Sequence, residues 1–250
     1  MICVLNDFFK NNPRFAVAFS GGVDSSYLLF AAANAGCDVR AYFIKSPFQP
    51  EFELDDATRF ADSFGIPLTI AAFDILGYPD IAGNPADRCY YCKTAILSKL
   101  RELARADGFT ILCDGTNADD DETGRPGMRA LREQGVMSPL REYGLSKADI
   151  RRLSKQAGLF THDKPAYACL ATRIPTDTAI TGELLEKIER AENALSGMGF
   201  SDFRVRFLPP GNAKIQLPDG QMDMAFARRS EIVKSMSPDF NSVTLDLTPR

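Results

Sequence analysis

The chain has 250 residues, a formal net charge of −4 at pH 7 and 45% hydrophobic residues, an ordinary composition for a globular protein. No apolar run approaches the length of a membrane span, and the first residues carry no basic segment followed by an apolar core, so we expect a cytoplasmic protein without membrane association. The acidic balance, with a sequence pI near 5.2, disfavours nucleic acid as a partner.

Predicted strands and helices alternate along the first two thirds of the chain. The strands are expected at 15–19, 39–44, 67–73 and 109–113, and the helices at 24–35, 51–64, 94–106 and 146–157. This alternation predicts an α/β fold with a parallel, doubly wound sheet. After residue 176 the pattern changes to helices at 181–195 and 221–235 and strands at 203–207, 213–217 and 243–247. We therefore expect a larger α/β domain over 1–176 and a small α+β domain over 177–250.

The turn between the first strand and the first helix reads Ser20-Gly21-Gly22-Val23-Asp24-Ser25-Ser26. The glycines allow a tight turn and a close approach of backbone to a ligand. The serines lie where the first helical turn leaves amide donors unpaired and carries a partial positive charge. Such a turn is an anion site, and phosphate is the best candidate. It lacks both the Gly-Lys-Ser/Thr of a Walker loop and the third glycine of a dinucleotide fingerprint.

The same turn matches the Ser-Gly-Gly-x-Asp-Ser pattern of the pyrophosphate-loop ATPases, which implies ATP cleaved between its α- and β-phosphates. Because the carboxyl ends of neighbouring strands flank the ligand crevice, the backbone around Phe43 and Ser46 is a candidate for binding adenine. The fourth strand runs into a glycine and several acidic residues, a pattern typical of a phosphate or magnesium site. Gly115 and Thr116, in this segment, are further expected contacts of the nucleotide.

Six cysteines are present, and two of them, Cys89 and Cys92, are separated by two residues and lie just before a predicted helix. That spacing suits zinc, an iron–sulfur cluster or a redox disulfide. Two ligands do not complete a structural zinc or cubane site, so a partner is needed. Cys169 is the best candidate, because it follows a proline-containing loop expected to return to the crevice. The remaining cysteines are expected to be small buried hydrophobic residues: Cys3, Cys37 and Cys113.

Three further segments resemble the LarE family of ATP-dependent sulfur transferases, and with the pyrophosphate loop the resemblance covers nearly the whole chain. These segments are 114–120, 139–147 and 164–173. The resemblance implies a sheet like that of the adenine nucleotide α-hydrolases. It also implies that the enzyme adenylates a carboxylate of a pyridinium dicarboxylate mononucleotide and replaces oxygen with sulfur. In this family the product leads to the nickel-pincer nucleotide cofactor of lactate racemase.

The resemblance also gives the cysteines a role. In one branch of the family a single cysteine, matching Cys169, gives up its sulfur and becomes dehydroalanine. In another branch three cysteines hold a 4Fe–4S cluster that delivers a sulfide. Because Cys89 and Cys92 accompany Cys169, this chain resembles the cluster-bearing branch. Three ligands would leave one iron open to bind hydrosulfide; iron and zinc both remain open from the residues alone.

Other roles follow from the resemblance. Asp24 is expected to help place Mg²⁺, and Lys93 and Lys164 to neutralise phosphate or adenylate charge. Four residues of the C-terminal domain match the family's substrate and assembly contacts: Glu192, Arg204, Arg206 and Asp223. Thr172 and Arg173 are expected to line the same site. The two strand arginines alternate and so share one face, where they could grip a substrate phosphate bidentately. Alternatively, that face could be solvated and Glu192 an exposed helix residue.

Three other functions remain as alternatives. A tRNA thiolase of the same superfamily would need a basic surface, which the acidic total disfavours. An ammonia-using synthetase would have no use for the three cysteines. A non-catalytic nucleotide-binding protein would bind ATP without releasing pyrophosphate. The resemblance further suggests a homo-oligomer assembled through the C-terminal domain, and a sulfur donor or a nickel-insertion protein as a partner.

Overall fold

The computed structural model describes residues 4–120 and 126–250 and divides the chain into two compact units. Unit 1 comprises the chain up to Ile75 together with Asp87–Lys164, and unit 2 comprises Leu76–Ala86 together with Pro165–Arg250. These units are defined by packing, and the functional division after residue 176 stays a prediction. In the described residues, no helix combines the length and apolar character that a membrane crossing requires.

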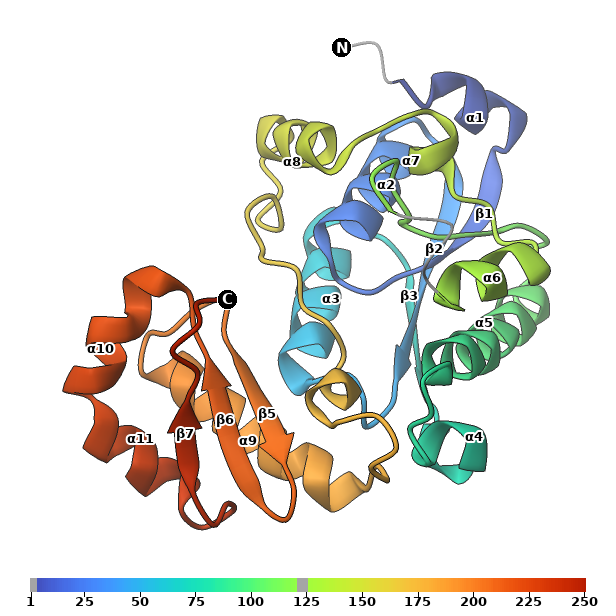
Figure 1. Ribbon diagram of the computed structural model, residues 1–250. Coiled ribbons are helices and arrows are strands. Elements are labelled where there is room, and N and C mark those ends of the chain that lie inside the picture. The colour runs from blue at the N-terminus through green and yellow to red at the C-terminus, as the bar shows by residue number, and fades with distance from the viewer. Residues whose placement is uncertain (1–3, 121–125) are drawn as a thin grey trace. The chain divides into compact units, whose positions relative to one another are not determined.

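Unit 1 is built on a four-stranded parallel sheet with strand order β3-β2-β1-β4 (Figure 1). The strands are β1 (Arg14–Ala18), β2 (Asp38–Lys45), β3 (Leu68–Ala72) and β4 (Leu112–Cys113). The central strand β1 pairs with β2 through five residues and with β4 through Ala16 and Val17. The predicted parallel α/β fold is confirmed, and the β1–β4 pairing brings the two expected phosphate-binding segments to one edge.

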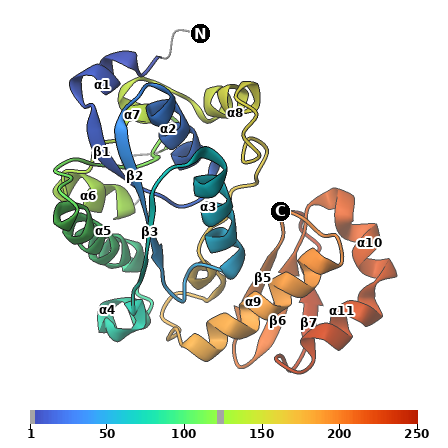
Figure 2. The same cartoon turned by 180° about the vertical axis from the view of Figure 1, so that it is seen from behind.

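Helices cover both faces of this sheet, because successive side chains of a buried strand point to opposite sides. Phe15 and Val17 pack into a core with residues from α1, α2, α3, α7 and α8, while Ala16 and Tyr42 pack with residues from α5 and α6. Figure 2, the view from behind, shows α5 and α6 on one side of the strands and α2, α3 and α8 on the other. The helices are α1 (Asn6–Asn11), α2 (Val23–Asn34), α3 (Glu51–Phe64), α5 (Arg88–Ala106), α6 (Pro126–Glu133), α7 (Pro139–Glu142) and α8 (Lys147–Gln156).

Unit 2 holds a three-stranded mixed sheet with order β5-β6-β7. The antiparallel hairpin of β5 (Arg204–Leu208) and β6 (Asn212–Gln216) is joined by β7 (Val243–Leu245), which runs parallel to β6. Leu185, Ile188 and Leu195 form the buried stripe of helix α9, which packs on β5 and on helix α11. The helices are α4 (Pro79–Ala82), α9 (Gly182–Gly197), α10 (Met222–Ala227) and α11 (Arg229–Met236).

Three local predictions differ from the structure. Helix α5 begins at Arg88 rather than at residue 94, so Cys89 lies in its first turn and Cys92 in the next. Strand β4 has two residues instead of five, because only Leu112 and Cys113 pair with β1. The helix expected over 221–235 is two helices, which meet at Arg228.

Candidate active site

The glycine turn between β1 and α2 packs directly against helix α3. Gly21 has φ +68°, and a Cβ at this position would lie 3.1 Å from the Glu53 carbonyl oxygen and 3.4 Å from the Ala57 nitrogen. Both the backbone conformation and the space therefore require glycine. The turn lies where the sequence pattern predicts it, at the carboxyl end of the central strand.

Two polar atoms in the first turn of α2 have no hydrogen-bond partner among the described residues. Asp24 Oδ1 and the Ser26 hydroxyl oxygen are both buried, and neither is paired. Ser25, in contrast, contacts the Ser20 hydroxyl at 3.2 Å and the Gly22 carbonyl oxygen at 3.4 Å, which ties the turn together. Leaving buried polar groups unpaired costs free energy. Their position beside the unpaired amides of a helix N-terminus fits a phosphate ligand and its cation.

The end of β4 forms a second wall of this site. A Cβ at Gly115 would lie 2.7 Å from the Ser25 nitrogen and 3.0 Å from its Cα, so the two backbones touch. Buried Asp114 fixes this approach by accepting hydrogen bonds from the Thr116 hydroxyl (2.5 Å) and the Ser138 hydroxyl (2.7 Å). The structure thus brings Gly115 and Thr116 to the predicted loop, with the Thr116 hydroxyl directed to Asp114.

Asp24 is paired with a lysine to which the sequence analysis assigned no role. The Lys147 ammonium donates a hydrogen bond to Asp24 Oδ2 at 2.6 Å. Burial raises the pKa of Asp24, and the contact with Lys147 opposes that rise. The Lys147 backbone N–H in turn donates to Asp119 Oδ2 at 2.7 Å, within the acidic segment after β4. The available sequence signal was a lysine directly after the helix cap Ser146.

The two lysines predicted to neutralise phosphate occupy different settings in unit 1. Lys164 reaches the pyrophosphate loop, where its ammonium lies 3.2 Å from the Gly21 carbonyl oxygen and 2.6 Å from Asp56 Oδ2. Lys93 lies half-buried on α5. Its side chain packs against Gly127 of α6, where an added Cβ would lie 3.2 Å from Lys93 Cδ. Lys164 therefore contacts the predicted loop directly, and its charge is shared with Asp56.

The predicted adenine segment lies at the end of β2. Phe43 is a core residue with 1% exposure, so only its backbone could meet a ligand. The backbone N–H and the hydroxyl of Ser46 both donate to Gln49 Oε1, at 3.1 and 2.7 Å. These bonds form a closed turn after the strand. Adenine binding to this segment stays a prediction.

Cys89 and Cys92 lie one helical turn apart at the start of α5, so they share one side of the helix. Cys89 is exposed and Cys92 half-buried, and an Arg88 guanidinium nitrogen lies 3.6 Å from the Cys89 sulfur. The thiolate is the form of cysteine that binds metal. Cys169 belongs to unit 2 and is half-buried.

The three-cysteine metal site stays a prediction. Across residues 4–120 and 126–250, no group of three or more His, Cys, Asp or Glu side chains is arranged to hold a metal ion. Of the cysteines expected in the core, Cys113 is fully buried and its thiol pKa is raised by burial. Cys37 is half-buried, and Cys3 lies outside the described residues.

Glu192 is the centre of a buried network in unit 2, and it is not an exposed helix residue. Its carboxylate accepts from Arg173 Nε at 2.8 Å, from the Tyr167 hydroxyl at 2.5 Å and from the Val205 backbone N–H at 2.9 Å. Arg173 and Glu192 are 1% and 4% exposed. Arg173 also donates to the Ala168 carbonyl oxygen at 2.7 Å, so the pair braces the segment before and after Cys169.

The strand arginines of β5 hold the same segment from the other side. Arg204 donates to the Ala166 carbonyl oxygen at 2.8 Å, and Arg206 donates to the Thr172 carbonyl oxygen at 2.9 Å. Desolvation by burial lowers the pKa of both guanidinium groups, so the face is not freely solvated. Asp223 is exposed on α10. Five of the six predicted substrate contacts thus gather around the segment carrying Cys169, and their binding role stays a prediction.

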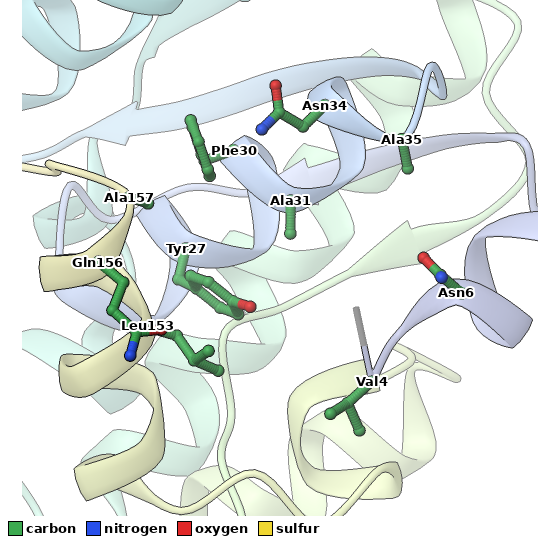
Figure 3. Close-up of a pocket in the computed structure, with 10 residues that line it drawn as sticks. All are labelled: Val4, Asn6, Tyr27, Phe30, Ala31, Asn34, Ala35, Leu153, Gln156 and Ala157. Carbon is green, nitrogen blue, oxygen red and sulfur yellow. The ribbon is translucent and has the colours of Figure 1, made fainter. Parts of the chain in front are cut away.

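A separate cavity of about 390 Å³ lies on the outer side of α2 in unit 1 (Figure 3). Tyr27 and Ala31 of α2 and Leu153 of α8 are among its lining residues. Tyr27 and Ala31 belong to the middle turns of α2, beyond the first turn that carries Asp24 and Ser26. The cavity is therefore distinct from the predicted phosphate site.

Comparisons with known proteins relate the chain to sulfur-transfer enzymes. No family model matches it. It is 37% identical to an uncharacterized protein of Synechocystis sp., over 97% of this chain and 92% of that protein. It is 32% identical to the pyridinium-3,5-bisthiocarboxylic acid mononucleotide synthase of Lactiplantibacillus plantarum, over 95% of this chain and 87% of that enzyme. A tRNA-specific 2-thiouridylase of Marinobacter nauticus is 24% identical, over 84% of this chain and 57% of that enzyme. The chain therefore belongs to the LarE family of ATP-dependent sulfur transferases, within the pyrophosphate-loop ATPase superfamily.

Proposed function

We propose that this enzyme converts carboxylates of a pyridinium dicarboxylate mononucleotide into thiocarboxylates, in biosynthesis of the nickel-pincer nucleotide cofactor of lactate racemase. The observation that carries the proposal is the 32% identity, over 95% of the chain, to a pyridinium-3,5-bisthiocarboxylic acid mononucleotide synthase. The pyrophosphate loop supplies a matching chemical requirement, because a carboxylate must be activated before sulfur can replace its oxygen.

The activation step uses the residues around the first turn of α2. The amides and hydroxyls of Ser20–Ser26 bind the phosphates, Asp24 holds Mg²⁺, and Lys164 neutralises charge beside the loop. A substrate carboxylate attacks the α-phosphorus of ATP and pyrophosphate leaves, which gives an acyl-adenylate. The unpaired Asp24 Oδ1 and Ser26 hydroxyl support this assignment, because a nucleotide and its cation would satisfy both.

The sulfur step depends on the three cysteines. Cys89, Cys92 and Cys169 would hold a 4Fe–4S cluster, which would supply sulfide for the exchange at the adenylated carboxylate, with AMP as the leaving group. The one-turn spacing of the two cysteines on α5 supports their binding to one metal group. Arg204 and Arg206 hold the backbone on either side of Cys169. In the proposed complex their remaining donors face the substrate phosphate.

The test combines product analysis with metal analysis of anaerobically purified protein. Wild type with the pyridinium dicarboxylate mononucleotide, Mg·ATP and sulfide is expected to release pyrophosphate and to form product carrying one oxygen-to-sulfur exchange, read by mass spectrometry. It is also expected to hold about four irons per chain. Cys89→Ala, Cys92→Ala and Cys169→Ala should each lose the iron. Pyrophosphate release without sulfur in the product would refute the sulfur step.

The alternative is sacrificial use of the Cys169 sulfur, which the half-buried thiol of that residue permits. In that case Cys89→Ala would retain one turnover per chain. The mass of the wild-type chain would then fall by the equivalent of H₂S, as Cys169 becomes dehydroalanine. A homo-oligomer, a sulfur-donor protein and a nickel-insertion protein remain proposed partners.

A further inference from the structure

The contact between Lys147 and Asp24 joins the start of helix α8 to the predicted phosphate site. The ammonium lies 2.6 Å from Asp24 Oδ2, and the two side chains are 33% and 20% exposed. The pair is thus partly shielded yet open to solvent from one side.

Lys147 is held in this position by its backbone. It is the first residue of α8, and its N–H donates to Asp119 Oδ2 at 2.7 Å. The preceding residue, Ser146, caps the helix by accepting from the Asp149 N–H at 3.1 Å. The ammonium therefore projects from a fixed helix start, whereas an exposed lysine on a loop would sample many positions.

The other oxygen of Asp24 shows that Lys147 satisfies only half of the carboxylate. Asp24 Oδ1 is buried without a hydrogen-bond partner among the described residues. The same is true of the Ser26 hydroxyl, two residues further along α2. The Lys147 ammonium bonds to Asp24 Oδ2 and leaves both of these oxygens without a partner. The arrangement suits a cation with several oxygen ligands, which is what Mg²⁺ carrying ATP phosphates requires.

We infer that Lys147 is the counter-ion of Asp24 in the nucleotide-free enzyme, and that on nucleotide binding Asp24 exchanges it for Mg²⁺ while the ammonium turns to the phosphates. This inference rests on the proposed nucleotide site. Lys147 is then a positioning and phosphate-binding residue with two consequences. It raises affinity for the nucleotide–metal complex, and it weakens binding of Mg²⁺ alone, because the metal must first displace an internal cation.

The test measures binding separately from turnover. The probes are MgCl₂ alone, followed by thermal unfolding, and magnesium α,β-methylene-ATP, followed by calorimetry. In Lys147→Met the Kd of the analogue is expected to rise about 10- to 100-fold, as for loss of a charge-assisted hydrogen bond. MgCl₂ alone should raise the Tm of this variant but not of wild type. Lys147→Arg should recover part of the analogue affinity.

Two controls make the result specific. Lys155→Met alters an exposed lysine on the same helix and should behave as wild type. In the double variant Asp24→Asn with Lys147→Met, the MgCl₂ effect should disappear. An analogue Kd within about twofold of wild type would overturn the inference. So would loss of analogue affinity without a gain in Mg²⁺ binding, which would make Lys147 a phosphate contact only. Wild type that fails to bind the analogue would refute the nucleotide site itself.

Discussion

At Gly115, the methyl group of an alanine should push apart the two segments that form the phosphate site, the end of β4 and the first turn of α2. An added Cβ would meet the Ser25 backbone at 2.7 and 3.0 Å, and backbone cannot move aside as a flexible side chain can. Gly115→Ala is therefore expected to lower the free energy of unfolding by about 1–3 kcal/mol. It should also weaken nucleotide binding. Urea unfolding and calorimetry with a nonhydrolysable ATP analogue measure the two effects.

The matched control for this substitution is Gly197→Ala. Gly197 ends α9, has no heavy atom within 4 Å of its built Cβ and has no positive φ. Its replacement should leave stability unchanged or slightly higher, because alanine favours the helix. Equal losses in the two variants would contradict the close approach at Gly115.

Tyr42 should make unit 1 less stable at alkaline pH. Its hydroxyl donates to Asp107 Oδ2 at 2.8 Å, and burial together with this carboxylate raises the pKa of the phenol well above its usual range. Above about pH 10 the unfolded chain loses this proton while the folded chain keeps it, so stability falls as pH rises. The slope attributable to Tyr42 should approach about 1.4 kcal/mol per pH unit.

Unfolding free energies measured by urea between pH 9 and 11 test this dependence. Tyr42→Phe should reduce the slope, whereas Tyr78→Phe, which alters an exposed ring, should not. The same slope in wild type and in Tyr42→Phe would show that other groups cause the alkaline loss.

At the scale of elements, the cap of α8 should affect both stability and the phosphate site. Ser146→Ala removes the hydrogen bond to the Asp149 N–H, at a cost of about 1 kcal/mol. Because Lys147 is the next residue, nucleotide affinity should fall as well. Thr181→Ala removes the equivalent cap of α9 in unit 2, where the hydroxyl accepts from the Leu184 N–H at 3.2 Å. It should cost a similar stability without changing nucleotide affinity, as calorimetry would show.

Local signals were sufficient for most elements of the fold. Apolar runs and glycine turns placed β1, β2 and α3 within a residue or two, because hydrophobic periodicity is a short-range property. The start of α5 was missed because Tyr90, Tyr91 and Cys92 are weak helix formers, and tertiary packing overrides this preference. Strand β4 was overestimated because its length depends on pairing with β1, which the sequence does not reveal.

The residues of the candidate site also differ in how far the sequence alone predicts them. The pyrophosphate loop is contiguous in sequence and could be recognised from its pattern. The Asp24–Lys147 pair joins residues 123 positions apart, and no local pattern indicates such a contact. Glu192 likewise has the polarity of an exposed helix residue, and only its partners Arg173 and Tyr167 explain its burial.

For the molecule as a whole, the acidic net charge disfavours tRNA as a substrate. The formal net charge is −4, and the chain matches only 57% of the length of the Marinobacter nauticus thiouridylase. Nonspecific RNA affinity comes mainly from cationic contacts with phosphates. Bulk tRNA is therefore expected to show no gel shift at physiological salt with up to about 10 µM protein. A salt-sensitive shift under these conditions would favour the thiolase alternative.

The segment Leu76–Ala86 interrupts unit 1 in sequence but packs with unit 2. Its Asn84 side chain donates to the carbonyl oxygens of Ile174 and Pro175, and the Ile180 N–H donates to the Ala82 carbonyl oxygen. On the ribosome these partners emerge about 90 residues later, a delay of roughly 5–18 s at ordinary elongation rates. The segment must remain solvated during that interval. Unit 2 therefore cannot finish folding independently of the synthesis of unit 1, and a fragment cut at residue 177 would lack one of its own packing surfaces.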